Sequence, residues 1–133
     1  MLGDHVPAII NKLELESLGD EALTEVKERE VPYVIWANYP AAFPEQPELM
    51  TVTDLVPSML QTAGLPLSEY YRLLLRLHEE IPARTLHGYY LNWDGSTGLL
   101  AEHPAYEDLK RYYELEYNGL DCGRDYRADL FLP

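Results

Sequence analysis

The chain has 133 residues, of which 47% are hydrophobic and 11% aromatic, a composition typical of a folded domain rather than a disordered segment. Its net charge of −13 opposes contact with phosphate backbones and anionic lipid, so we expect no nucleic-acid partner and no direct membrane contact. The single cysteine, Cys122, excludes an internal disulfide framework and a cysteine-based metal cluster. No apolar run is long enough to span a bilayer and no signal peptide is visible, so we expect a soluble chain.

The first regular segments lie in and after an acidic run from Glu14 to Glu30. Within this run, residues 20–29 are predicted to form a helix with one apolar edge and a solvated acidic face. Residues 31–39 read VPYVIWANY, and this β-branched and aromatic stretch predicts a strand. Its nearly continuous apolar run favours a strand covered on both faces, as in a parallel α/β sheet.

Two helices are predicted after a proline-rich loop. The first spans residues 54–63, with Thr53 or Asp54 as its N-cap and Gly64 closing it in a left-handed turn. The second spans residues 68–79, begins at Ser68 and ends before a proline.

The last third of the chain predicts a hairpin and one more helix. Residues 87–100 place Asp94-Gly95 between two short apolar runs, a pattern typical of a hairpin turn. A helix is expected over 105–117 with Gly119 ending it, and the tail from residue 122 is expected to be irregular.

These elements predict a helix-rich α/β fold with few strands. A strand covered on both faces needs parallel neighbours, and no other segment of the sequence reads as one. We therefore interpret residues 1–133 as a single, partial domain from which part of a sheet is missing.

Several polar and aromatic residues stand out, and each has an ordinary structural interpretation. The sequence predicts that Asp54 is a helix cap and that His78, His87 and His103 are surface or capping residues. In each pair of adjacent tyrosines, one ring is expected in the core and the other at the rim, rather than both serving as a sugar platform. These pairs are Tyr70-Tyr71, Tyr89-Tyr90 and Tyr112-Tyr113.

Four segments, in order, resemble the lipoteichoic acid synthase and sulfatase-like branch of the alkaline phosphatase superfamily. Gly3-Asp4-His5 resembles the metal-binding turn of that family. Residues 31–39 resemble its strand TPFxIWSN, residues 53–65 resemble DxxPTLLxLAG, and residues 113–120 resemble a closing YxLLQYDLL. Ser58 stands where the family has Thr, and Asn118 where it tends to have Asp. Both departures are conservative.

The resemblance implies that the chain is the C-terminal portion of a larger catalytic domain, whose preceding residues would supply the missing sheet. It implies that Asp4 and His5 are ligands of a divalent cation (Mn²⁺, Mg²⁺, Ca²⁺ or Zn²⁺), for which mixed carboxylate and imidazole ligands are suitable. Members of this family transfer or hydrolyse phosphoryl-type or sulfuryl groups. They are commonly anchored by N-terminal membrane helices, with the catalytic domain outside the cytoplasm.

No residue of the chain itself reads as a catalytic nucleophile. Cys122-Gly123-Arg124 lacks the CxPSR context of sulfatase cysteines. No Gly-rich or acidic surroundings that suggest a nucleophile turn are found at Thr24, Thr62, Thr85 or Thr97. Two ligands leave a cation mostly hydrated, so we expect weak metal binding and no turnover by this chain alone.

A second hypothesis treats the chain as a non-catalytic interaction or oligomerisation module derived from the same fold. An apolar strand without neighbours invites edge pairing, so a homodimer through residues 31–39 is expected in this case. The partner under the first hypothesis is instead the preceding part of the parent domain.

Overall fold

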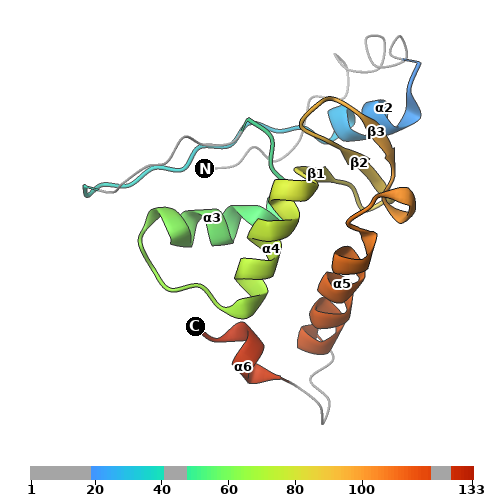
Figure 1. Ribbon diagram of the computed structural model, residues 1–133. Helices are drawn as coiled ribbons and strands as arrows, with labels where there is room; N and C mark the ends of the chain where they lie inside the picture. Colours follow the sequence, from blue (N-terminus) through green and yellow to red (C-terminus); the bar gives the residue numbers. More distant parts are fainter. Residues whose placement is uncertain (1–18, 41–47, 121–126) are drawn as a thin grey trace.

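The computed structural model describes residues 19–40, 48–120 and 127–133. Figure 1 shows a small sheet at one end of the molecule, with helices α4 and α5 running away from it and α3 beside α4. The helices are α2 (Glu21–Glu28), α3 (Leu55–Thr62), α4 (Glu69–Glu80), α5 (Tyr106–Leu120) and α6 (Ala128–Phe131). Two short 3₁₀ segments, η1 (Val52–Asp54) and η2 (Leu100–Glu102), precede α3 and follow the sheet.

Local signals explain where the predicted helices begin and end. The Asp20 side chain accepts a hydrogen bond from the Leu23 N–H at the start of α2, and Ser68 does the same for the Tyr71 N–H in α4. After α3, Gly64 adopts a φ of 69° and the Leu65 N–H bonds back to the Leu60 carbonyl. The predicted helices near 20–29, 54–63, 68–79 and 105–117 are confirmed.

The sheet is an antiparallel meander of three strands, β1 (Ala83–Arg84), β2 (Tyr89–Leu91) and β3 (Thr97–Leu99). Tyr90 faces Gly98 in the hairpin, which confirms the hairpin predicted over 87–100. Gly95 has a φ of 83° in its turn, a conformation that glycine adopts at little cost. The helix-rich α/β class is therefore confirmed, with antiparallel strands in place of the parallel ones expected.

The strand predicted over residues 31–39 is wrong. Tyr33 alone in this segment takes part in a β-bridge. Exposure alternates along the chain, so that Val34 is 59% and Trp36 78% exposed while their neighbours are half-buried. The residue types do favour extended backbone, but a strand also needs a hydrogen-bonding neighbour along its length, and none of the described segments provides one. The expectation that both faces of this segment are covered is also wrong, because Val34 and Trp36 are exposed.

The expectation of an irregular tail and of a helix end at Gly119 also needs correction. Helix α5 continues to Leu120, and α6 forms a short turn of helix within the tail. A Cβ on Gly119 would lie 3.0 Å from the Phe131 ring, so the glycine allows α6 to approach α5 closely.

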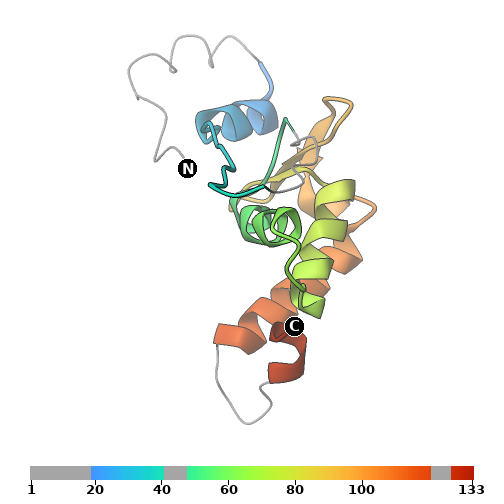
Figure 2. The same ribbon diagram turned by 90° about the vertical axis from the view of Figure 1, so that its left-hand side faces the viewer.

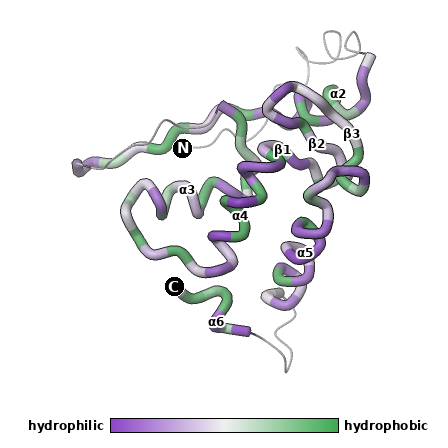
Figure 3. Tube along the Cα trace, in the orientation of Figure 1, coloured by the Kyte–Doolittle hydropathy of each residue, from purple (hydrophilic) through white to green (hydrophobic). Residues whose placement is uncertain are grey.

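Two groups of buried side chains hold these elements together. The larger lies mainly between α4 and α5, whose amphipathic alternation is visible in Figure 3. Its buried members are Leu73, Leu74, Leu77, Ile81, Leu100, Ala105, Leu109 and Tyr112. The smaller joins α2 to the sheet through Val26, Ala83 and Leu91.

Candidate functional site

The two predicted metal ligands, Asp4 and His5, lie outside the described residues, as does Cys122. Among residues 19–40, 48–120 and 127–133, no group of three or more His, Cys, Asp or Glu side chains is arranged to hold a metal ion. The polar cluster that the described residues do build involves Asp54, Arg84 and His78.

Asp54 is completely buried at the junction of η1 and α3. Its Oδ1 accepts a hydrogen bond of 2.6 Å from Arg84 Nη2, and the Arg84 side chain is only 5% exposed. Arg84 Nη1 also donates to the Ile81 carbonyl at 2.9 Å. Asp54 makes no capping hydrogen bond, so its predicted role as a helix cap is wrong. The carboxylate instead joins η1 to β1 through Arg84.

His78 completes the cluster from the last turn of α4. Its Nδ1 lies 3.5 Å from Asp54 Oδ2, and these two buried atoms have no hydrogen-bond partner. The Trp93 ring and the imidazole form a T-shaped contact, with centroids 5.4 Å apart and an interplanar angle of 84°. His78 is buried, so its prediction as a surface or capping residue is wrong. The charged pair of the cluster is Asp54 and Arg84, and removing one of these two is costly because the other buried charge is left without compensation.

The sequence contains a signal for this cluster that the capping interpretation missed. Asp54 is the single charged residue between Leu49 and Ser68. A lone carboxylate in an apolar stretch is a candidate for burial with a cationic partner. Arg84 lies 30 residues further along the chain, so the identity of that partner depends on the fold.

His103 is not at the surface, and its side chain bonds to a backbone N–H that lies before α5 rather than capping a helix. The ring is buried, its Nδ1 accepts the Ala105 N–H at 3.1 Å, and its Nε2 faces Asn92 Oδ1 at 3.2 Å. These two contacts are both satisfied when the ring is neutral and carries its proton on Nε2. Burial lowers the pKa of His103, and the Coulombic effect of Glu80 opposes this.

We expect wild-type stability to decrease as the pH falls below the ordinary histidine pKa of 6.5, because the folded-state pKa of His103 is the lower one. A proton on Nδ1 would break the bond from the Ala105 N–H, at a cost on the order of 1 kcal/mol. Urea unfolding at pH 7.5 and 5.0 measures the change. His103→Asn should lose less unfolding free energy than wild type between pH 7.5 and pH 5.0. An identical loss in wild type and His103→Asn would contradict this assignment.

His87 lies at the surface, as predicted. Its Nδ1 is 2.6 Å from Glu25 Oε1, which also accepts from Arg29 Nε at 2.7 Å. Ala22 and Val26 are buried on the opposite side of α2, so the described part of the acidic run is a solvated helix face. The Glu25 side chain that both groups contact is 14% exposed, whereas those of Arg29 and His87 are 50% and 60% exposed.

The tyrosine pairs follow the predicted pattern in one case of three. Tyr112 is buried and Tyr113 is exposed, whereas both members of the other two pairs are half-buried. Tyr70 stacks on Tyr112 with centroids 6.2 Å apart, and the Tyr112 hydroxyl donates to Glu116 Oε1 at 2.5 Å. Burial, together with the bond to Glu116, raises the pKa of Tyr112. These stacked rings pack in the α4–α5 contact.

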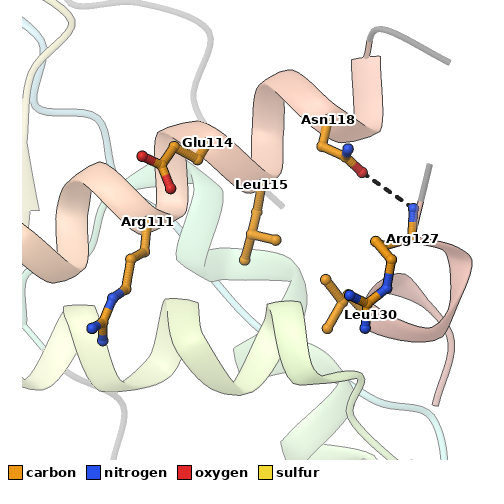
Figure 4. A pocket seen from close by; sticks show the side chains of 6 residues that line it. All are labelled: Arg111, Glu114, Leu115, Asn118, Arg127 and Leu130. Carbon is orange, nitrogen blue, oxygen red and sulfur yellow. Dashed lines mark hydrogen bonds between the residues drawn. The ribbon is translucent and has the colours of Figure 1, made fainter. Parts of the chain in front are cut away.

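A hollow of ≈ 400 Å³ lies between α5 and α6 (Figure 4). The Arg127 N–H donates to Asn118 Oδ1 at 3.2 Å across it. Two arginines line the hollow, and both are already paired, Arg111 with Asp108 and Arg127 with Asp129. Both arginine side chains are mostly exposed. The exposed arginines leave the hollow without the enclosed lining of a substrate site.

Comparisons with known proteins add no family assignment. No protein-family model matches the chain, and neither the curated proteins nor the solved structures give a match. None of the helices within the described ranges combines the length and the apolarity that crossing a membrane requires.

Proposed function

We propose that this chain is the C-terminal portion of a metal-dependent phosphoryl or sulfuryl transferase or hydrolase, similar to sulfatases and phosphoglycerol transferases. The observation that carries the proposal is the order of the four resembling segments: Gly3-Asp4-His5, 31–39, 53–65 and 113–120. By the same resemblance, the parent enzyme is membrane-anchored with its catalytic domain outside the cytoplasm.

In this proposal Asp4 offers an anionic oxygen and His5 a neutral imidazole nitrogen to one divalent cation. Gly3 before them and Pro7 after them are residues that favour the sharp turn needed for adjacent side chains to face one ion. Such a cation lowers the pKa of a bound hydroxyl and neutralises charge on the leaving oxygen. The nucleophile and the remaining ligands would come from the preceding part of the parent domain.

A titration of the full chain with Mn²⁺, followed by electron paramagnetic resonance, tests the proposed ligands. We expect weak binding, with a Kd on the order of 1 mM, because two protein ligands leave the ion mostly hydrated. Asp4→Asn and His5→Ala should each abolish this binding. The same chain should not hydrolyse a phosphodiester or a sulfate ester.

Asp94→Asn is the matched control, since Asp94, like Asp4, is next to a glycine in the sequence, and Asp94 is exposed. It should leave Mn²⁺ binding unchanged. Tight stoichiometric binding that survives Asp4→Asn, or equal losses in Asp4→Asn and Asp94→Asn, would show that the ligand assignment is wrong.

The second candidate function is a non-catalytic interaction module. The exposed apolar side chains of residues 31–40 favour it, because such side chains in a soluble chain commonly mark a contact surface. The two candidates make different predictions: metal binding depends on Asp4 and His5, whereas association depends on residues 31–40.

A further inference from the structure

Two buried polar atoms of the cluster of Asp54, Arg84 and His78 are left without a hydrogen bond. They are Asp54 Oδ2 and His78 Nδ1, and they lie 3.5 Å apart. The other carboxylate oxygen, Oδ1, already accepts from Arg84 Nη2 at 2.6 Å and from Thr53 Oγ1 at 3.2 Å. Buried polar atoms are almost always hydrogen-bonded, because an unsatisfied one has lost its bond to water without a replacement. Two such atoms side by side therefore need an explanation.

The charges of the cluster decide which of the two atoms can donate. The Arg84 guanidinium is always protonated and only donates, and the Asp54 carboxylate that pairs with it only accepts, so Oδ2 needs a donor. A neutral imidazole carries its proton on one of its two nitrogens. With the proton on Nε2, lone pairs of Oδ2 and Nδ1 would face each other. With the proton on Nδ1, a single hydrogen bond satisfies both atoms.

The surrounding elements keep the two side chains together. Asp54 is the last residue of η1, directly before α3, and His78 lies in the last turn of α4. Figures 1 and 2 both show α3 beside α4. Trp93 contacts the imidazole, and its Nε1 donates to the Glu79 carbonyl at 3.0 Å. The distance from Nδ1 to Oδ2 has to shorten by only a few tenths of an ångström to reach the usual range of an N–H···O bond.

We propose that Asp54 positions His78 by holding the neutral imidazole in the form that carries its proton on Nδ1. The Nδ1–H group donates to Oδ2, so that one carboxylate joins donors from β1 and α4. Nε2 is then the acceptor nitrogen of the ring, which is the arrangement in which a histidine oriented by a carboxylate accepts a proton. His103 has the opposite arrangement, since its Nδ1 accepts from the Ala105 N–H.

Long-range ¹H–¹⁵N NMR correlation of the full chain tests the proposal, because the ¹⁵N shift of a ring nitrogen shows whether it is protonated. The spectrum is recorded at about pH 8, above the ordinary histidine pKa of about 6.5. The chain contains four histidines, and His78→Gln and His103→Asn identify the two sets of signals. We expect His78 to be protonated on Nδ1 alone. His103, the internal control, should be protonated on Nε2 alone.

Asp54→Asn tests the part played by the carboxylate. The amide oxygen of the new side chain should stay on Arg84, which only donates, so the amide NH₂ would face His78 Nδ1 in place of Oδ2. We expect the proton of His78 to move to Nε2, while the signals of His103 stay unchanged. Asp20→Asn, a change at an exposed aspartate, should leave both histidines as they are in wild type.

Protonation of wild-type His78 on Nε2, or on both ring nitrogens, would overturn the proposal. The same pattern for His78 in wild type and in Asp54→Asn would also overturn it. The wild-type spectrum decides where the proton lies even if Asp54→Asn does not fold. None of these measurements involves Asp4, His5 or residues 31–40, so their outcome is independent of both functions proposed above.

Discussion

Replacing Asp54 by asparagine is expected to lower the free energy of unfolding by about 3–5 kcal/mol. Asparagine has nearly the same shape but carries no charge, so Arg84 would remain buried without its carboxylate partner. The helix-cap interpretation gives a different result, since asparagine caps helices as well as aspartate does. Urea unfolding of wild type and Asp54→Asn at pH 7 distinguishes the two roles.

Asp20→Asn is the matched control for this measurement. Asp20 does cap a helix, through the Leu23 N–H at 3.0 Å, and it is exposed. We expect its replacement to change stability by less than about 1 kcal/mol. If Asp54→Asn proves as mild as Asp20→Asn, the buried ion pair does not contribute as we infer.

Removing both charges should cost less than the two single changes together. In the double variant Asp54→Leu/Arg84→Met neither a carboxylate nor a guanidinium is buried, and apolar replacements of buried pairs are often tolerated. A double-variant cycle by urea unfolding should therefore show favourable coupling between the two substitutions. Strict additivity would indicate that the 2.6 Å contact has little energetic consequence.

Leu109→Ala is expected to destabilise the chain by about 2–5 kcal/mol. Leu109 is fully buried in α5 and belongs to the larger core, with Leu74, Leu77 and Ile81. Truncation removes apolar contacts and leaves a cavity between α4 and α5 that the surrounding helices fill only in part. Urea unfolding measures this loss as a decrease in the free energy of unfolding, with the slope of that free energy against urea concentration unchanged.

Leu86→Ala serves as the control for this substitution, because Leu86 is almost fully exposed. Its replacement should alter stability by no more than about 0.5 kcal/mol. Comparable losses in Leu86→Ala and Leu109→Ala would mean that the α4–α5 contact is not the main core of the folded chain.

The helices and the hairpin could be predicted because their signals are local. Ser68 bonds to an N–H three residues away, Gly64 turns the chain directly after α3, and the Asp94-Gly95 turn joins neighbouring strands. Strand β1 was missed because it has only two residues, too few to show an alternating pattern. The pairing of Ala83 with Leu91 depends on the sheet rather than on residues near Ala83.

Residues 31–39 show the limit of such local signals. Valine, isoleucine and tryptophan favour extended backbone, and exposure does alternate along this segment. Whether an extended segment becomes a strand depends on a neighbour elsewhere in space, which no local pattern contains. The proposed ligands Asp4 and His5 remain predictions for a different reason, because they lie outside the described residues.

The sequence by itself determined helices α2 to α5, the Ser68 cap, the turn at Gly64, the hairpin turn and the acidic face of α2, because each of these depends on residues within about one turn of one another. Only the tertiary structure decided the roles of Asp54, His78 and Arg84. A carboxylate before a helix looks like a cap until the fold brings a guanidinium from 30 residues away to 2.6 Å and excludes water from both. Burial and partnership are properties of that three-dimensional arrangement, so they decided which polar residues stabilise this protein.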